Sequence, residues 1–329
     1  MAFSLPLDHD VAQTLTIAGG GPAGLACGIR MLEQGWAVTV HERGRYPLKK
    51  VCGGFLSPRA WQRLRDLGAD KHLSHPPRPL RRARFYAGDK SYAEFDLAPQ
   101  AWSLRRSALD SALAGRFREL GGRLEEASEW RPGPDNGRVV DARGRDAGAK
   151  DGPWMAWKAY LAGAAAPPEL GTVDLIMLPL DGAYAGLDWM DDGSICVSLI
   201  ARRGRSLPKL LNGHPILAAV APSLRAECAI SGFSLATRSG GLRLGDRRRV
   251  WPPLVGDGIH RALASGEALA KDLTGQASGR SSWDASSLQF GLALGLHYGM
   301  LSAWPRRAGL ACLSAWPSLA TNLYRWTRF

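Results

Sequence analysis

The strongest constraint on the fold is a glycine pattern near the N-terminus, Gly19-x-Gly21-x-x-Gly24. The apolar run at 15–18 that precedes it is typical of a buried parallel strand. A helical pattern of apolar residues follows the glycines, and a second strand-like run lies at 37–40. Because strand, glycine turn, helix and strand follow one another in a unit of about thirty residues, the sequence predicts an α/β fold with a parallel sheet.

Each glycine of this pattern, the helix that follows it and Glu42 would have a distinct role in binding a dinucleotide. Gly19 permits a tight turn, Gly21 lets the backbone approach a pyrophosphate, and Gly24 lets the helix pack closely on the strand. The N-terminus of the helix offers free N–H groups and a partial positive charge to phosphates. Glu42, at the end of the second strand, is placed to accept hydrogen bonds from ribose hydroxyls. The pattern therefore predicts a dinucleotide site and leaves NAD and FAD open.

The chain of 329 residues carries a net charge of +12, and arginines cluster at 81–84, 202–205 and 247–249. This charge favours an acidic carrier protein, an acidic cofactor or a membrane surface as partner, or it reflects an arginine-rich solvated surface. The sequence contains no helix-turn-helix, zinc-finger or RNA-binding signature, so we expect no nucleic-acid partner.

The five cysteines are scattered and never spaced C-x-x-C, so neither a disulfide framework nor a zinc or other metal site is predicted. The first residues, a leader at 1–13, have no basic segment before an apolar one and do not form a secretory signal. No apolar run reaches the roughly 20 residues of a membrane span. These features predict a cytoplasmic protein.

Beyond the glycine pattern, the apolar spacing predicts further helices and strands. Strand-like runs lie at 83–86 and 92–95 around a turn, and at 139–140, 157–160, 173–178, 194–200 and 242–246. Helical spacing is present at 59–67, 107–120, 206–229 in two pieces, and 258–273. The strand-like runs of the middle region predict an antiparallel sheet.

The tail from 288 to 329 is apolar, basic and rich in tryptophan, and it contains the sequence Leu-Ser-Ala-Trp-Pro twice. One interpretation is a set of helices packed on the body of the protein. The other is an interfacial anchor that makes peripheral contact with a membrane, because tryptophan and arginine suit that boundary.

Three separated stretches, 19–42, 106–110 and 244–270, together resemble FAD-dependent oxidoreductases of the p-hydroxybenzoate hydroxylase and geranylgeranyl reductase superfamily. The middle stretch has the pattern Arg-x-x-Leu-Asp, and the last one has Gly-Asp followed by spaced proline and glycines. The loop Cys52-Gly53-Gly54 looks like that of the reductase branch and of its hydroxylase-like relatives. The resemblance implies a Rossmann-like FAD-binding domain, discontinuous in sequence, with an inserted antiparallel-sheet substrate domain and C-terminal helices.

The resemblance also implies roles for individual residues. Arg106 would reach the cofactor, Asp246 would bond the ribityl chain, and the helix at Gly258 would direct its dipole at the flavin. The full set of expected cofactor-binding residues is Gly19, Gly21, Pro22, Ala23, Gly24, Glu42, Arg43, Cys52, Gly53, Arg106, Asp246, Pro253, Gly256, Gly258 and Ile259. NAD(P)H would bind transiently, because there is no second glycine fingerprint. Cys52, Tyr184 and His297 are candidate catalytic residues, and each also has a structural interpretation.

Several positions depart from the family pattern. Arg143 replaces an expected aspartate, and Arg247-Arg248-Arg249 replaces an expected Ala-Ala-Gly. The reductases' Tyr-x-Trp-x-Phe-Pro motif is reduced to Tyr184-Ala-Gly186, and the halogenases' Trp-x-Trp-x-Ile-Pro motif is not matched. The arginines raise the question of whether bulky side chains fill the cofactor cleft.

We expect an FAD-binding domain at 14–75, 100–150 and 237–280, a substrate domain at 76–99 and 151–236, and a helical tail at 281–329. The predicted function is that of an FAD-dependent monooxygenase acting on a small apolar substrate, aromatic or polyketide-like, free or carried on an acidic carrier protein. The alternatives are a flavin-dependent ene-reductase of prenyl or lipid chains, and a non-catalytic flavin- or lipid-binding protein.

Overall fold

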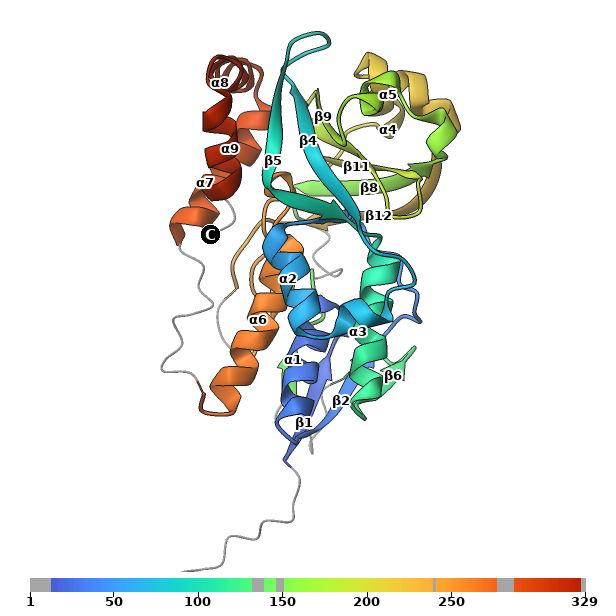
Figure 1. Cartoon of the computed structure of the whole chain (residues 1–329), viewed down its shortest axis with the longest axis vertical. Helices are drawn as coiled ribbons and strands as arrows, with labels where there is room; N and C mark the ends of the chain where they lie inside the picture. The colour runs from blue at the N-terminus through green and yellow to red at the C-terminus, as the bar shows by residue number, and fades with distance from the viewer. Residues whose placement is uncertain (1–12, 132–138, 146–150, 239–240, 277–286, 327–329) are drawn as a thin grey trace, which may run out of the picture.

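The computed structural model describes residues 13–131, 139–145, 151–238, 241–276 and 287–326. Residues 1–12 of the expected leader lie outside this part of the chain, as do the segments 146–150 and 277–286, in which expected domain boundaries fall. Within the described part, the chain forms a four-stranded sheet, an eight-stranded sheet, and helices that pack against both (Figure 1).

The four-stranded sheet is parallel, and the glycine pattern directly follows its strand β1. Its order is β6-β2-β1-β7, with β1 (Thr14–Ala18), β2 (Ala37–Glu42), β6 (Arg123–Glu126) and β7 (Val139–Asp141). Helices α1 (Pro22–Glu33), α3 (Arg106–Glu119) and α6 (Gly258–Leu273) share one buried apolar cluster with this sheet. The predicted strands at 15–18 and 37–40 and the predicted helix at 107–120 are therefore confirmed.

The second sheet has eight strands in the order β12-β8-β11-β10-β9-β4-β5-β3. They are β3 (Phe55–Leu56), β4 (Arg78–Tyr86), β5 (Tyr92–Ser103), β8 (Trp154–Leu161), β9 (Leu175–Leu180), β10 (Ala183–Trp189), β11 (Ile195–Arg202) and β12 (Arg225–Phe233). Every pairing is antiparallel except that of β4 with β9, which is parallel. The predicted hairpin and antiparallel sheet are confirmed, with one parallel pair added.

Two predicted elements are wrong in part. The helix expected over 206–229 exists only as α4 (Leu207–Leu211) and α5 (Pro215–Val220), because the chain from Arg225 pairs with β8 as an edge strand. The strand expected at 242–246 is reduced to a bridge between Asp141 and Arg243. Gly245 then adopts a left-handed conformation with φ of 53°, which ends extended structure there.

Short connecting elements complete the secondary structure. Helix α2 (Pro58–Asp66) begins at the Ser57 cap, where Ser57 Oγ accepts a hydrogen bond from the Ala60 N–H. The 3-10 turns are η1 (Ala69–His72), η2 (Gly163–Ala165), η3 (Pro168–Gly171), η4 (Ala221–Ser223), η5 (Gly245–Arg247) and η6 (Pro253–Val255).

Over residues 287–326, the described part of the tail, the chain forms three helices, α7 (Ser287–Leu301), α8 (Ala303–Ala315) and α9 (Pro317–Trp326). They lie alongside β5, on the side of the sheet away from α4 and α5 (Figure 1). Tyr324 Oη donates a hydrogen bond to Pro99 O at 3.0 Å, and Arg306 Nε donates to Ala87 O at 3.0 Å. Among the described residues, no helix is both long and apolar enough to cross a membrane.

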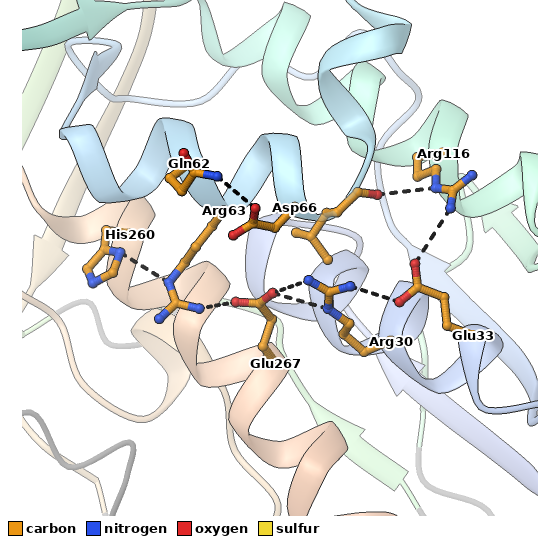
Figure 2. Close-up of polar contacts among 9 residues, drawn as sticks. Arg30, Glu33, Gln62, Arg63, Asp66, Arg116, His260 and Glu267 are labelled. Carbon is orange, nitrogen blue, oxygen red and sulfur yellow. Dashed lines mark hydrogen bonds and ion pairs between the residues drawn. The ribbon is translucent and has the colours of Figure 1, made fainter.

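Helices α1, α2 and α6 are joined by a network of ion pairs (Figure 2). Glu267, buried on α6, accepts hydrogen bonds from Arg30 on α1, with Nη2 at 2.7 Å, and pairs with Arg63 on α2. The backbones of α1 and α6 also approach closely, because a Cβ on Gly266 would lie 2.3 Å from Ala23 O. These contacts fix the relative positions of α1 and α6, whose N-terminal ends both line the cavity described next.

Candidate functional site

One cavity of about 930 Å³ extends from the parallel sheet to the tail helices. At one end it is lined by the glycine turn, represented by Gly19 and Gly21, and at the other by Leu313 and Tyr324 of the tail. All the expected cofactor-binding residues line this cavity except Gly24. Stretches far apart in the sequence therefore converge on one site, as the family resemblance implies.

The three glycines of the turn differ in what surrounds them. A Cβ on Gly19 would lie 2.4 Å from Ala142 O, and Gly19 has a left-handed φ of 111°. A Cβ on Gly24 would lie 2.1 Å from Gly19 O, so this glycine brings α1 against β1. Around Gly21 nothing lies within 4 Å of the added atom. The open face at Gly21, next to an α1 N-terminus that no side chain caps, fits an anion such as a pyrophosphate.

Glu42 is held rigidly at the end of β2. Its Oε2 accepts a hydrogen bond from the Gly20 N–H at 2.9 Å, and its Oε1 accepts one from the Gly44 N–H at 3.0 Å. Lys50 Nζ lies 3.6 Å from Oε1. The carboxylate lines the cavity beside Arg43. A carboxylate has about four acceptor sites, so capacity remains for ribose hydroxyls.

Arg106 reaches the cavity from the start of α3. Its Nη2 donates to both carboxylate oxygens of buried Asp110 at 3.0 Å, one helical turn away. Burial opposes the charge of the guanidinium, but the acidic groups around it, above all Asp110, together outweigh burial and hold the pKa of Arg106 above its usual range. The Arg-x-x-Leu-Asp pattern is therefore an i,i+4 ion pair that orients a permanent positive charge at the cavity wall beside Cys52.

The unexpected arginines have partners outside the cavity. Arg247 Nε donates to Asp141 Oδ2 at 2.7 Å, and Arg249 Nε donates to Thr237 Oγ1 at 2.8 Å. Asp141 also pairs with Arg143. Burial of Asp141 opposes its charge, but the two arginines outweigh this and lower its pKa to about 2. None of the residues 247–249 is among those that line the cavity, so these three arginines leave the cleft open, whereas Arg143 lines the cavity while it is paired with Asp141.

Asp246 does line the cavity, next to the glycine turn of η5. Its Oδ2 accepts a hydrogen bond from Arg145 Nε at 2.9 Å, and Arg145 lines the cavity as well. The expected ribityl ligand is therefore already paired with a cation, which fixes the direction of the carboxylate.

A second helix begins at the cavity. Pro253, Gly256, Gly258 and Ile259 line it, and no side chain caps the N-terminus of α6. Gly256 has a left-handed φ of 65°, and a Cβ there would lie 2.7 Å from the Phe55 ring. The positive end of the α6 dipole therefore faces the cavity, opposite the Cys52–Gly53 loop.

The candidate catalytic residues Tyr184 and His297 meet in the structure. Tyr184 Oη lies 3.0 Å from His297 Nδ1, and both side chains are buried. Burial, with Arg202 nearby, lowers the pKa of His297 to about 4, so the imidazole is neutral at pH 7. Its Nε2 is buried without a hydrogen-bond partner. Tyr184 lines the cavity, whereas His297 is not among the residues that line it.

Sequence reasoning did not identify Asp188 or Ser198, which also line the cavity. Asp188 follows Tyr184 and Gly186 at alternate positions of β10, and alternate residues of a strand share a face. That spacing is the signal that could have identified it. Among the described residues, no cluster of histidine, cysteine and carboxylate side chains could hold a metal ion.

Comparison with known proteins gives one curated relative. A segment of 131 residues is 30% identical to a 1H-pyrrole-2-carbonyl-(peptidyl-carrier protein) brominase of Pseudoalteromonas luteoviolacea (strain 2ta16). The matched segment spans 39% of this chain and only 32% of the brominase. No protein-family model matches the chain.

Solved structures match over far more of the chain. The flavin-dependent brominase Bmp2 superposes with a TM-score of 0.70 and 17% identity, over 96% of this chain and 93% of that one. A flavoprotein/dehydrogenase from Cytophaga hutchinsonii gives a TM-score of 0.65 and 15% identity, over 88% and 86% of the two chains. The chain thus has the fold of the FAD-dependent oxidoreductase superfamily, as the sequence motifs predict.

Proposed function

We propose that the protein is an FAD-dependent monooxygenase that hydroxylates an apolar aromatic or polyketide-like substrate. The observation that carries this proposal is the single cavity that joins the glycine turn to an apolar chamber under the eight-stranded sheet. A dinucleotide held at one end would extend its reactive ring toward a substrate held at the other. The proposal agrees with the fold, which the chain shares with flavin-dependent enzymes.

The residues of the first end fit FAD. The N–H groups of the α1 N-terminus would hold the pyrophosphate over the open face of Gly21, and Glu42 would bind the ribose. Asp246 would bind the ribityl hydroxyls, and the α6 N-terminus would stabilise negative charge on the ring. Bound FAD would supply the redox chemistry and the activation of oxygen, and NAD(P)H would bind only transiently as its reductant.

The second end selects an apolar substrate. The chamber is lined by Phe85, Phe95, Leu175 and Met177 from the sheet and by Leu313 from α8. Such walls exclude water from the reacting atoms and contribute binding energy in proportion to the apolar area that they cover. The few polar groups that face the chamber would then set the orientation of the substrate.

The substrate could be delivered on an acidic carrier protein. The curated relative acts on a pyrrole carried by a peptidyl-carrier protein. A net charge of +12 suits an acidic partner, because complementary charge accelerates association. The cysteines of the described chain are all free, which fits a reducing cytoplasmic compartment.

A monooxygenase is favoured over an ene-reductase by strand β10. The reductase motif expects large aromatic side chains along this strand, but Gly186 and Asp188 occupy its later positions. Both residues line the cavity, so the substrate chamber is wider and more polar there than the reductase motif would make it.

The test begins with the visible absorption spectrum of the purified protein, before and after addition of FAD. A flavin spectrum that persists after gel filtration is expected, and a protein that stays colourless contradicts the proposal. Aromatic and polyketide-like probes are then incubated with the flavin-loaded protein and reductant, in air and under nitrogen, with and without bromide. Oxygen-dependent hydroxylation supports a monooxygenase, whereas reduction under nitrogen indicates a reductase and bromide-dependent products indicate a halogenase.

A further inference from the structure

Strand β10 presents three residues to the cavity in sequence. Tyr184, Gly186 and Asp188 alternate along the strand and all line the cavity. A Cβ on Gly186 would lie 3.1 Å from Met177 Sδ and 3.4 Å from Ser198 Oγ, a tight contact, so the glycine lets these two side chains close over the strand. A substrate in the cavity beside β10 would contact Asp188, which lines the cavity as well.

Asp188 is a buried carboxyl group at the cavity wall, with 2% of the residue exposed. Its Oδ2 accepts a hydrogen bond from Ser103 Oγ of β5 at 2.9 Å. Its Oδ1 lies 4.0 Å from the position that a Cβ on Gly53 would take. The carboxyl group is thus fixed on one side by Ser103 and faces the Cys52–Gly53 loop, which the family resemblance places near the flavin ring.

The charged and titratable groups around Asp188 come from several elements. Lys158 of β8 approaches it, but Lys158 Nζ is paired with Glu227 at 2.7 Å. Cys196 of β11 is the register partner of Asp188, and Cys52 lies across the cavity wall. Burial raises the pKa of Asp188 to about 8, against the lowering effects of Ser103 and Lys158. At pH 7 the group is therefore protonated and can donate a hydrogen bond into an apolar chamber.

We propose that Asp188 is the acid–base residue of the site, which exchanges a proton with an ionisable oxygen of the substrate, a phenol or an enol. The inference rests on the proposed function, because it concerns the substrate held in the same chamber. In one direction the Asp188 O–H bond breaks, its proton moves to the oxygen of a substrate phenolate or enolate, and the electron pair stays on the Asp188 carboxylate. No electron is transferred, and the reverse step returns the proton.

A purely structural role explains the site less well. An asparagine at position 188 could accept the Ser103 hydrogen bond without the cost of desolvating an ionisable group. A carboxyl group that is buried, faces a cavity and has a strongly raised pKa is more typical of a functional site. The geometry gives Asp188 one oxygen held by Ser103 and places the other 4.0 Å from the position of a Cβ on Gly53, which lines the same cavity.

The test measures the binding of 4-nitrophenol to the protein supplied with FAD, by calorimetric titration over a range of pH. The wild-type complex would hold one proton between Asp188 and the phenolate. Its affinity should therefore fall about tenfold per pH unit above about pH 8, where neither group retains the proton. Asp188→Asn keeps an N–H donor that does not titrate, so its affinity for the phenolate should stay constant in that range. Asp181→Asn, at the exposed turn before β10, is the matched control and should behave as wild type.

Folding and flavin binding are checked separately by thermal melting and by FAD titration. If Asp188→Asn does not fold, Ser103→Ala serves instead, because losing the Ser103 donor should move the fall in affinity to higher pH. The same pH dependence in Asp188→Asn as in wild type would overturn the inference, and so would a wild-type protein that does not bind 4-nitrophenol. A protein that takes up no FAD but shows the pH-dependent phenol binding would contradict the proposed function and leave the role of Asp188 standing.

Discussion

Replacing two glycines of the same turn should change different properties: one substitution should weaken FAD binding, and the other should destabilise the fold. At Gly21 the backbone has φ of −79° and ψ of −178°, which any residue adopts, and nothing lies within 4 Å of an added Cβ. Gly21→Val should therefore change the free energy of unfolding by no more than about 0.5 kcal/mol. At Gly24 the added Cβ would lie 2.1 Å from Gly19 O, so Gly24→Ala must displace α1 from β1.

The magnitudes follow from these surroundings. The valine side chain at position 21 would occupy the space through which a pyrophosphate approaches the α1 N-terminus. Loss of two charge-assisted hydrogen bonds, each worth about 1.5–3 kcal/mol, weakens FAD binding by roughly 10²- to 10⁴-fold. Overpacking at position 24 should lower the free energy of unfolding by about 1–3 kcal/mol or more.

The assay combines FAD titration by flavin fluorescence with urea unfolding of each protein in the absence of FAD. Gly21→Val should unfold like wild type and bind FAD poorly, whereas Gly24→Ala should unfold at lower urea. Wild-type affinity for FAD in Gly21→Val would refute the dinucleotide assignment. Equal destabilisation in both variants would refute the difference in packing that the structure assigns to the two positions.

Three further predictions concern carboxylates that are paired with arginines. Glu267→Gln leaves two arginines facing each other across α1 and α2, and should lower the free energy of unfolding by about 2–4 kcal/mol in urea titration; wild-type stability would contradict this. Asp141 has a pKa of about 2 in the folded protein, below its ordinary value, so its stabilising effect is present above about pH 4 and is lost as pH falls toward 2. Asp141→Asn should flatten that acid limb of stability measured by circular dichroism. Asp246→Ala should weaken FAD binding by roughly 10- to 100-fold in fluorescence titration, and unchanged affinity would exclude it as a ribityl ligand.

The parts of the site that sequence could predict depend on local geometry. The three roles of the glycines follow from their spacing in one turn, and the surroundings of Gly19, Gly21 and Gly24 agree with those roles. The pairing of Arg106 with Asp110 is equally local, because residues four apart on a helix lie on one face.

The features that sequence reasoning missed depend on contacts between distant segments. The apolar residues of the chain from Arg225 also suit a helix. In the structure, this segment instead pairs with the edge of β8 and forms strand β12. The strand expected before Gly245 is cut short because it pairs with β7 through Asp141 alone, whose N–H donates to Leu242 O and whose carbonyl accepts from the Leu244 N–H. The secondary-structure propensity of a short sequence window does not show whether a distant strand is available as a backbone partner.

The arginines at 247–249 show the same limit for side chains. The family pattern places small residues there, so the sequence suggests obstruction of the cleft. In the structure, Arg247 pairs with Asp141 at the end of β7, 106 positions earlier in the chain, and Arg249 donates to Thr237. Contacts with residues outside the family motif therefore hold these two arginines, and neither lines the cavity.

The role of the tail helices can be inferred from the side chains that they leave exposed and from the backbone carbonyls to which they donate hydrogen bonds. Trp304 and Trp316, the tryptophans of the repeated sequence, are 79% and 62% exposed, as an interfacial anchor would require. The inner side of the same helices supplies hydrogen bonds to backbone carbonyls of β5, including that of Pro99, and of Ala87 in the turn after β4, and apolar side chains to the chamber. Removing the helices would leave strand carbonyls without these partners and open the substrate end to water, which makes packing on the body their primary role. Since the chamber wall belongs to the tail, residues such as Leu313 and Tyr324 should determine which substrate fits, whatever the outer tryptophans contact.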